Sequence, residues 1–484
     1  MSKKITSFEE LNKVEDFSLV KEIVFKDEKS KEFLNIISRC ENLEVLQIYN
    51  TKLEVFPIEI LELKNLKEIT LESCKISHFP NKVPVNKKLE VLNLSKNRLK
   101  KIPFSNFPNL RKLNFQNNLR ISDIPDSISA LSNLEVLIAN DCKISNVSTQ
   151  IIKLENLRHL NLENNEIIDF PNIQNAKKIE EINLISTGLK ELPGFIGRLE
   201  NLKILKIHRN HISTLPKEFC SFKNLEELYL QDNKLTELPE DFQYLERLKK
   251  LYLFDNSLAE FPISVCELEN LEELLLNKNS LKNIPEEIGN LINLKKLFLG
   301  RNDFLKLPNT IGDLKSLEVL KIDNSRIREV PNSFRNLINL EHLDLGYSRL
   351  ETIQEEICRL KNLEFLDCSH TLLHEVPREI SNLSKLKKMD LSRTYFTELP
   401  DEITEMKNLE SLIIQYGKIE KLPENIDEMT NLKKIYFSFS CLESLPESIL
   451  NIHELEALSV SKNNITSFPE GIKDMKNYKN FYLY

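Results

Sequence analysis

A 23-residue period constrains what this chain can fold into more than any other feature. In one repeat, Leu225, Leu228 and Leu230 precede Asn233 and Pro239, and the next 23 residues repeat the same pattern. A fixed period of this length is typical of a solenoid, in which each repeat stacks only on its neighbours. The 484 residues therefore predict a stack of repeats, and they do not predict several globular domains.

The repeats begin at Val20 and continue to the end of the chain. Most are 23 residues long, and the repeats of other lengths start at Leu89, Leu110 and Leu157. The N-terminal third is therefore the less regular part. We predict a solenoid of about twenty repeats over residues 20–484, with a partial repeat that supplies a terminal strand at its end.

The two ends of the stack need separate predictions. Ser7 and Glu10 have the spacing of a capping box, so residues 1–19 are predicted to form a capping segment with a short helix. At the other end, Tyr478, Phe481 and Leu483 begin a strand without a dedicated cap. An open edge of parallel strands favours association. Either the terminal aromatic residues cover that edge, or a second copy of the chain does.

Each repeat predicts one short strand and one helical turn. Positions 4 and 6 are apolar with a polar residue between them, which is typical of a strand with one buried face. Strands that follow one another at 23 residues must be parallel. Proline at position 15, as in Pro216 and Pro262, cannot donate to a sheet. Apolar residues at positions 18 and 21 predict an α or 3₁₀ turn after it.

Position 9 predicts a row of buried amides where each strand ends. A carboxamide can both donate to and accept from the backbone of a bend. Between Ser325 and Ser440 no asparagine occupies this position, so we predict a weaker row of hydrogen bonds there. The asparagines at position 9 are Asn97, Asn118, Asn165, Asn210, Asn233, Asn256, Asn279, Asn302 and Asn463.

The consensus LxxLxLxxNxLxxLPxxIxxLxN resembles the 23-residue leucine-rich repeat of the Ras-group intracellular class, which is also abundant in bacterial proteins. The resemblance implies an α/β solenoid, a leucine-rich repeat horseshoe with a parallel β-sheet on the concave face. Short helical or 3₁₀ turns are implied on the convex face, and protein binding is the implied role. Ser148 and Gln354 replace the proline, and Gly417 replaces the asparagine.

Composition and motifs argue against several classes of function. A net charge of −8 of mixed sign argues against nucleic acid as a partner. No apolar stretch is long enough for a membrane span, and no secretory signal precedes the repeats. We find no phosphate loop, metal-ligand spacing or catalytic set, and expect no metal or cofactor. The eight cysteines lack a CxxC pair and predict buried free thiols in a reducing compartment.

Side chains at positions 2, 3, 5, 7 and 8 are predicted to face the concave surface. Neighbouring strands lie about 4.8 Å apart, so equal positions form columns. Aromatic residues in columns five and seven, with basic residues around them, predict a patch that binds a partner. The alternative is that these rings only stack on one another across strands. The patch comprises Lys206, His208, Arg209, Tyr229, Tyr252, Phe254, Phe298 and Arg301.

Two further columns are candidates. Column eight contains Tyr347, His370, Arg393, Tyr416 and Phe439. We expect Tyr347 and Arg393 to extend the binding surface. The second column consists of Asp344, Asp367 and Asp390, which is either a site for a cation or basic peptide or a common form of the repeat.

The sequence leads us to expect a non-enzymatic, cytoplasmic scaffold that binds another protein on its concave face. Because Ras-group relatives serve as signalling scaffolds, the resemblance implies a GTPase, a kinase or a phosphatase as the partner. The alternative is a secreted bacterial effector or surface protein that binds a host molecule. A composition rich in Lys, Asn, Ile and Glu would suit such an origin.

Overall fold

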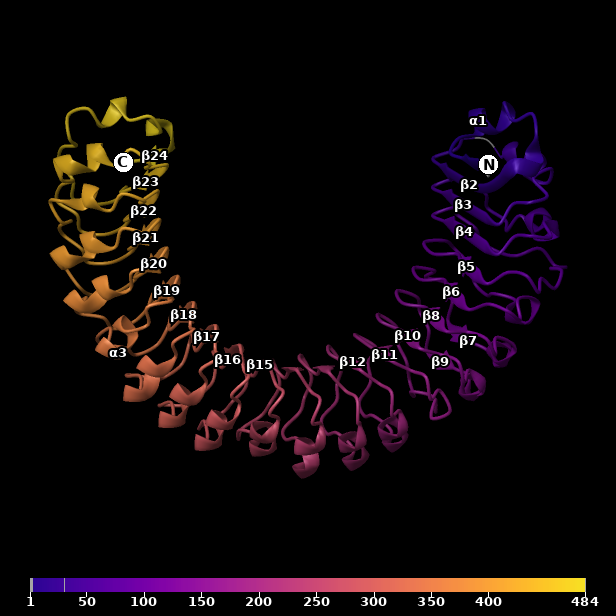
Figure 1. Cartoon of the computed structure of the whole chain (residues 1–484), viewed down its shortest axis with the longest axis horizontal. Coiled ribbons are helices and arrows are strands. Elements are labelled where there is room, and N and C mark those ends of the chain that lie inside the picture. The colour runs from indigo at the N-terminus through magenta and orange to yellow at the C-terminus, as the bar shows by residue number, and fades with distance from the viewer. Residues whose placement is uncertain (1–2, 30, 484) are drawn as a thin grey trace. The chain divides into compact units, whose positions relative to one another are not determined.

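The computed structural model describes residues 3–29 and 31–483, and the chain falls into two compact units, Met1–Lys234 and Leu235–Tyr484. Each unit is a stack of repeats. Figure 1 shows the strands on the inner side of each curved stack and the helical turns on its outer side. The predicted parallel sheet with short turns on the opposite face is therefore confirmed for each unit.

The first unit contains one main parallel sheet and one small one. Each strand of the main sheet pairs with the next without a change of direction. The main strands are β1 (Lys3–Ile5), β2 (Val20–Lys26), β3 (Val45–Tyr49), β4 (Glu68–Glu72), β5 (Val91–Asn93), β6 (Lys112–Asn114), β8 (Val136–Ile138), β10 (His159–Asn161), β11 (Glu181–Asn183), β12 (Ile204–Lys206) and β13 (Glu227–Tyr229). The small sheet pairs β7 (Asp123–Ile124) with β9 (Asn146–Val147) in the less regular third.

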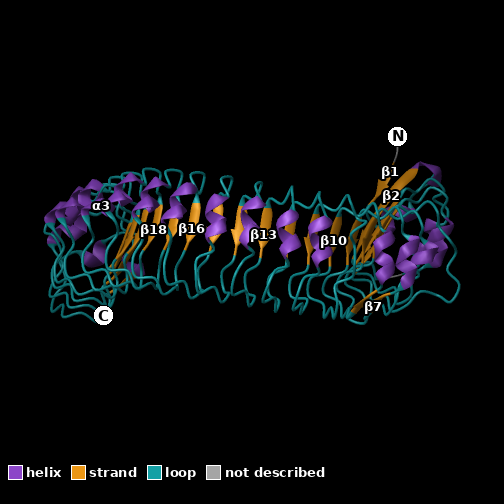
Figure 2. Cartoon of the chain, turned by 90° about the horizontal axis from the view of Figure 1, so that it is seen from below, coloured by secondary structure: helices purple, strands orange, loops and turns teal. Residues whose placement is uncertain are grey.

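The second unit repeats the same arrangement more regularly. Its strands are β14 (Lys250–Tyr252), β15 (Glu273–Leu275), β16 (Lys296–Phe298), β17 (Val319–Lys321), β18 (His342–Asp344), β19 (Phe365–Asp367), β20 (Lys388–Asp390), β21 (Ser411–Ile413), β22 (Lys434–Tyr436), β23 (Ala457–Ser459) and β24 (Phe481–Tyr482). β24 is the predicted terminal strand, and it pairs with β23. Figure 2 shows the strands of each unit side by side, with loops along both edges.

Most of the single helical turns follow the prolines. The α-helices are α1 (Phe8–Asn12), α2 (Phe33–Ile37) and α3 (Glu355–Cys358). The 3₁₀ turns of the first unit are Phe17–Leu19, Ile58–Glu62, Phe104–Asn106, Asp126–Ala130, Thr149–Lys153, Gly194–Arg198 and Lys217–Ser221. Those of the second are Glu240–Tyr244, Ile263–Glu267, Glu286–Asn290, Asn309–Asp313, Asn332–Asn336, Arg378–Asn382, Asp401–Glu405, Ile426–Glu428, Glu447–Asn451, Ile472–Asp474 and Tyr478–Asn480.

The two replacements of proline have different consequences. Ser148 caps its 3₁₀ turn, because its hydroxyl accepts from the N–H of Gln150 at 3.0 Å. After Gln354 the turn is α-helical, as α3, and the Cys358 N–H bonds to the Gln354 carbonyl. Proline in that position fixes the backbone but removes a donor. Serine keeps this N–H, which donates to the Ile124 carbonyl of the preceding repeat at 2.8 Å.

The N-terminal segment differs from its prediction in one respect. The helix α1 begins after Ser7, whose hydroxyl accepts from the Glu10 N–H at 3.1 Å. The Glu10 carboxylate does not close the box on Ser7, and instead accepts from the Thr6 N–H at 2.8 Å. The strand β1, which the sequence analysis did not predict, precedes this helix and pairs with β2. A segment predicted as a helical cap thus also adds one strand to the sheet.

The core of each unit is made by the apolar positions of the strands. Leu228 and Leu230 in the first unit are fully buried, and so are Leu251 and Leu274 in the second. In the second unit Leu251 is aligned with Leu274, and Leu274 with Leu297, across adjacent strands. Equal positions therefore do form columns. The alignment buries one face of every strand and leaves its alternate side chains on the inner face.

The cysteines are free, as predicted, and seven of the eight are buried, while Cys441 is partly exposed. Burial raises the pKa of the Cys40, Cys74 and Cys142 thiols to about 11. These thiols are therefore neutral and poor nucleophiles at physiological pH. In the part of the chain that the structure describes, no helix combines the length and apolar character that crossing a bilayer requires.

Position 8 of the repeats adopts a left-handed backbone conformation. Residues there have φ values between 50° and 60° and none is glycine. They are Asp27, Asn50, Ser73, Lys96, Asn117, Asp141, Asn164, Ser186, Arg209, Asp232, Asp255, Lys278, Arg301, Asn324, Tyr347, His370, Arg393, Tyr416, Phe439 and Lys462. At this residue the chain turns away from the sheet, so its side chain stands on the rim of the inner face.

Candidate functional site

The part of the predicted patch in the first unit lies on β12, β13 and the loop after β12. Lys206 is aligned with Tyr229 across the two strands. The Lys206 ammonium lies 2.7 Å from the Glu181 carboxylate, and the Tyr229 hydroxyl donates to Glu227 at 2.7 Å. The structure therefore holds both side chains against glutamates of the sheet, and each is only half-exposed.

His208 and Arg209 complete this part of the patch. The His208 ring lies 6.4 Å from the Tyr229 ring. Burial, with a smaller effect of the adjacent Arg209, lowers the pKa of His208 to about 4. His208 is therefore neutral at physiological pH. Arg209 points outward from the rim, 3.9 Å from Asp232, with most of its side chain exposed. It is the freely accessible cation of this group.

The part of the patch in the second unit is a row on β14, β15 and β16. Tyr252 is aligned with Leu275, and Leu275 with Phe298. The Tyr252 hydroxyl donates to the Glu273 carboxylate, and the Lys321 ammonium lies 5.0 Å above the Phe298 ring. Phe254 follows on the loop after β14, half-buried like the rest. Polar neighbours thus partly cover the aromatic row.

A more exposed aromatic surface lies along the rim of the second unit. Its apolar side chains are between 38% and 57% exposed. We call this surface the aromatic rim, and its residues are Tyr347, Leu372, Tyr395, Tyr416 and Phe439. Three of them occupy column eight, as the sequence analysis anticipated. Leu372 and Tyr395 stand at position 10, which lies outside the columns predicted to face a partner.

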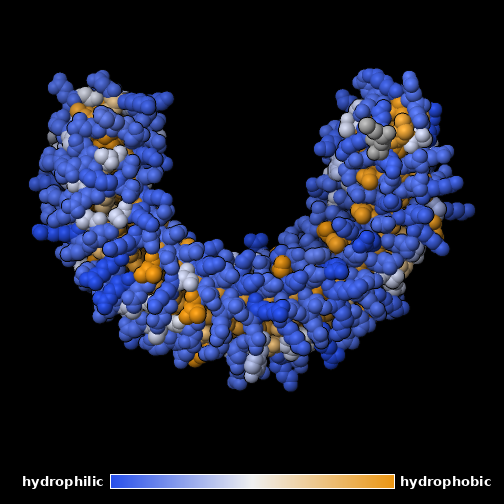
Figure 3. Space-filling model, in the orientation of Figure 1, coloured by the Kyte–Doolittle hydropathy of each residue, from blue (hydrophilic) through white to orange (hydrophobic). Residues whose placement is uncertain are grey.

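Ring contacts order the aromatic rim. The Tyr416 and Phe439 rings stack at 4.6 Å with an angle of 9°, and the Arg393 guanidinium lies 4.4 Å from the Tyr416 ring. Tyr347 makes an edge contact with His370 at 3.8 Å. The structure therefore places both Tyr347 and Arg393 in this surface. The face of the molecule that Figure 3 shows is mostly hydrophilic, with apolar patches that are small and separate.

The acidic column on β18, β19 and β20 is satisfied by its own backbone. Asp344, Asp367 and Asp390 each accept from the N–H two residues further on, at 3.1, 2.8 and 3.0 Å. Burial raises the pKa of Asp344 to about 6, and the nearby Asp367 adds to the rise. No group of three His, Cys, Asp or Glu residues suited to a metal ion occurs over the described residues. These contacts favour a turn-forming role over a cation site.

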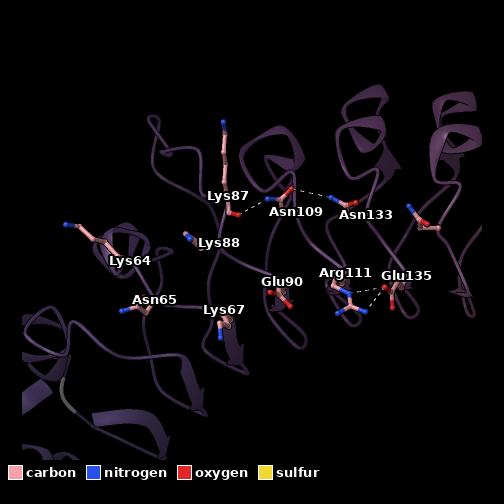
Figure 4. A pocket seen from close by; sticks show the side chains of 11 residues that line it. Lys64, Asn65, Lys67, Lys87, Lys88, Glu90, Asn109, Arg111, Asn133 and Glu135 are labelled. Carbon is pink, nitrogen blue, oxygen red and sulfur yellow. Dashed lines mark hydrogen bonds and ion pairs between the residues drawn. The ribbon is translucent and has the colours of Figure 1, made fainter. Parts of the chain in front are cut away.

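In the first unit, a hollow of about 470 Å³ lies at the edge of the sheet where the strands begin, opposite to the edge that carries position 8 (Figure 4). Its asparagines bond to neighbouring repeats, as in the 2.7 Å bond from Asn109 to the Lys87 carbonyl. Arg111 is paired with Glu135 at 2.7 Å. Figure 4 shows the Lys64 and Lys87 side chains pointing in different directions. The cations do not converge, so this edge serves stacking and forms no anion site.

Comparison with known proteins identifies the repeats. The family described as leucine-rich repeat region matches residues 348–440 and 378–483. The leucine rich repeat family matches 200–258 and 316–373, and a two-copy leucine rich repeat family matches 87–129. These matches fall in both units, and they include the stretch that carries the aromatic rim.

Solved structures share the fold. A leucine-rich repeat protein of Leptospira interrogans is 32% identical, covers 77% of this chain and 96% of its own, and superposes with a TM-score of 0.72. The plant peptide hormone receptor RGFR1, solved in complex with RGF2, has a TM-score of 0.53 at 21% identity, over 100% of this chain and 91% of its own. At that identity the likeness concerns the fold alone.

Curated relatives match only over part of their length. Ras guanine nucleotide exchange factor V of Dictyostelium discoideum is 28% identical over 185 residues, which is 38% of this chain and 8% of that protein. The human volume-regulated anion channel subunit LRRC8B is matched over 20% of its length. The chain thus spans a fifth or less of the length of both relatives. The leucine-rich repeat fold is commonly a non-enzymatic scaffold for protein–protein interaction. The repeat positions, the parallel sheet and the family matches together place this chain in the leucine-rich repeat family.

Proposed function

We propose that the chain is a non-enzymatic scaffold that binds another protein across the inner face of its sheet. The observation that carries this proposal is the aligned row of half-exposed side chains on the inner face, such as Tyr252, Leu275 and Phe298. Strand pairing fixes their spacing before any partner arrives. A preformed surface avoids the cost of ordering loops on binding, and tyrosine and arginine are enriched among the residues that dominate interfaces.

The setting we propose is the cytoplasm, in a signalling pathway. The free, buried cysteines are compatible with a reducing compartment. The similarity to a Ras guanine nucleotide exchange factor supports a signalling role. A GTPase, a kinase or a phosphatase is therefore the partner class to test first. Self-association through the terminal strand β24 stays a prediction, which sedimentation of the purified chain over a range of concentrations tests.

The second candidate is a secreted bacterial effector or surface protein that binds a host molecule. The similarity to the leucine-rich repeat protein of Leptospira interrogans, over nearly all of that protein's chain, supports a bacterial origin, which this alternative requires. The proposed binding face is the same in both cases, and only the location differs. An export assay with a tagged chain in its native host separates them. Tagged protein in the medium supports the effector, and retention inside the cell supports the signalling scaffold.

Affinity enrichment with the purified chain tests the binding face. The variant Tyr229→Ala/Tyr252→Ala/Phe298→Ala removes inner-face rings. Tyr244→Ala/Ile263→Ala removes exposed apolar side chains from 3₁₀ turns and serves as the matched control. We expect partners quantified by mass spectrometry to be lost from the inner-face variant and retained by the control, with both variants folded by circular dichroism. Equal recovery by the two variants would make the inner-face rings structural.

A further inference from the structure

A second hollow opens beside the aromatic rim in the second unit. It has a volume of about 400 Å³ and lies where β16, β17 and β18 end. Arg301, Arg326 and Arg349 line it from three consecutive repeats, and Tyr347 stands at its border with the rim. The other lining groups are mainly neutral amides and one hydroxyl. The hollow is therefore polar, and its charged groups are mostly guanidinium groups.

Positive charge is in excess in this hollow. Asp303 is the one carboxylate in the lining, and it pairs with Arg326 at 3.0 Å. Over the residues that the structure describes, neither Arg301 nor Arg349 has a side-chain hydrogen bond or ion pair. Asp323 contributes a negative charge near Arg301 but does not line the hollow. Arginine stays charged at every physiological pH, so two guanidinium groups lack a paired anion.

The excess of cations continues along the aromatic rim. From Asn324 to Cys441, positions 8 and 10 of the repeats contain no aspartate or glutamate. Aromatic and basic side chains make up most of these positions, and Arg393 packs against Tyr416. Lys418 likewise lies 5.2 Å from the Tyr395 ring. The hollow and the rim thus form one strip in which apolar surface and positive charge are mixed.

The ring geometry favours a polypeptide over a nucleic acid. Phe439 stacks on one side of the Tyr416 ring, and Arg393 packs on the same ring. Part of the Tyr416 ring surface that a base would need for stacking is therefore already engaged. The acidic column of Asp344, Asp367 and Asp390 and the net charge of −8 also oppose a phosphate backbone, which carries a charge at every residue. A peptide can place charge only where the strip has arginine.

We propose that this strip binds an extended, acidic segment of a partner protein. Its carboxylates pair with Arg301 and Arg349, and its apolar side chains lie on Tyr347, Tyr416 and Phe439. Six steps of about 4.8 Å separate the repeat of Arg301 from that of Phe439, a length that about nine extended residues span. The inference rests on the proposed function in requiring a protein partner, but it names a different surface and a defined chemistry.

A peptide binding assay tests the charge requirement. The probe is a fluorescein-labelled peptide of about ten residues in which glutamate and leucine alternate. The same peptide with lysine in place of glutamate and a thymidine oligonucleotide of similar length are the comparison probes. By fluorescence polarisation we expect the intact chain to bind the glutamate peptide, more weakly as salt rises, and to bind neither comparison probe.

Variants of the strip then locate the site. Arg301→Gln/Arg349→Gln should weaken binding of the glutamate peptide by about tenfold or more, because charge-assisted hydrogen bonds are lost. Tyr416→Ala/Phe439→Ala should weaken it several-fold. The matched control Arg335→Gln/Arg378→Gln, in two 3₁₀ turns, makes the same change of charge and should bind like the unaltered chain.

Three results would overturn the proposal: no binding of the glutamate peptide, equal binding by the Arg301→Gln/Arg349→Gln variant, or binding of the oligonucleotide in its place. Circular dichroism excludes a loss of fold in any variant. The affinity enrichment with inner-face variants is independent of this strip. If the strip fails and the inner-face rings still determine partner recovery, only the further inference falls.

Discussion

Two runs of repeats in the second unit share one backbone and differ in how they are joined. In the first run the Asn279 carboxamide accepts from the Leu258 N–H at 3.1 Å and donates to the Leu253 carbonyl at 3.0 Å, both in the preceding repeat. Asn302 makes the equivalent bonds to Leu281 and Leu276. Each amide therefore joins two neighbouring repeats. We call this run, with Asn256, Asn279 and Asn302, the amide run.

In the second run hydroxyl groups replace the amides, and the described position-9 side chains make no hydrogen bond to a neighbouring repeat. We call this run, with Ser325, Ser348, Thr371 and Thr394 at position 9, the hydroxyl run. The Thr371 and Thr394 hydroxyls each donate to a carbonyl of their own repeat, at 2.6 Å. Within the described structure the Ser325 and Ser348 hydroxyls are buried without a partner. The predicted weakening is therefore confirmed here, whereas Ser440 beyond this run still reaches the Ile414 carbonyl of the preceding repeat.

The same two runs also differ on their solvent side. The amide run carries the aromatic row of the inner face, and the hydroxyl run carries the acidic column and most of the aromatic rim. The comparison teaches that leucine packing and backbone pairing keep the strands in register without the amides, since both runs pair their strands alike. The amides add stability to a register that is already determined. The more exposed surface stands on the run with fewer bonds between its repeats.

The largest expected effect comes from removing one position-9 side chain in each run. Asn279→Ala should lower the free energy of local unfolding by about 3 kcal/mol, because three hydrogen bonds are lost and buried backbone groups lose their partners. Thr371→Ala should cost about 1 kcal/mol. Hydrogen exchange of peptides from the two runs measures both losses. Equal losses would contradict the comparison.

The acidic column provides a pH-dependent difference. Burial raises the pKa of Asp344 to about 6 from an ordinary value of 3.8, so the unfolded chain loses this proton first as pH rises. The contribution of the Asp344 carboxyl to the free energy of unfolding is greatest below pH 4, falls between pH 4 and pH 6, and is lost above pH 6. Asp344→Asn should therefore raise stability by about 1 to 2 kcal/mol at pH 7. Urea unfolding at pH 4 and pH 7 measures the gain, which should vanish at pH 4.

The exposed Asp313 is the matched control for that measurement, since it lies at the end of a 3₁₀ turn away from the column. Asp313→Asn changes the net charge by the same amount and should give no comparable gain at pH 7. A gain of the same size in both variants would assign the effect to net charge. The burial of Asp344 would then have no special role.

Restoring an amide in the hydroxyl run should produce a smaller gain. Ser348→Asn places a carboxamide at the spacing from Ile327 and Ile322 that Asn279 has from its partners. We expect a stabilisation of about 1 kcal/mol, seen as slower hydrogen exchange in the two neighbouring repeats. Ser348→Ala should be nearly neutral, because the serine hydroxyl makes no bond to lose. A loss with asparagine would show that the hydroxyl run cannot take up amide geometry.

The smallest effect should be the same in both runs. Lys295 pairs with Glu272 at 2.8 Å in the amide run, and Lys387 pairs with Glu364 at 2.7 Å in the hydroxyl run. All four side chains are well exposed, and such pairs contribute little. Lys295→Ala and Lys387→Ala should each leave the unfolding midpoint almost unchanged. A clear difference between them would mean that the runs differ in more than position 9.

The fold could be predicted because residues with the same structural role recur at the same positions of successive repeats. Apolar residues at positions 4 and 6, proline at position 15 and asparagine at position 9 each have one structural use, and the period aligns them. Elements that depart from the period could not be predicted. The small sheet of β7 and β9 and the strand β1 lie where repeat lengths or patterns deviate, and the pattern offers no template for them.

The candidate site was less predictable because exposure depends on neighbours. The sequence places Tyr229 and Tyr252 on the inner face, but column spacing does not reveal that their hydroxyl groups donate hydrogen bonds to Glu227 and Glu273. Nor does it show that the loop after each strand leaves position 10 exposed. The signal available in the sequence was an aromatic residue at position 10, such as Tyr395.

The left-handed backbone at position 8 restricts which side chains can vary on the rim. Branching at Cβ is strongly disfavoured in this conformation, and no valine, isoleucine or threonine occupies it among these residues. Glycine would relieve a cost of about 1 kcal/mol at each such position, yet none is used, so a side chain is kept at every one. Exchange of rim residues between repeats, by evolution or by engineering, is therefore restricted to residues that are unbranched at Cβ. Substitutions among these residues can change binding specificity without changing the core.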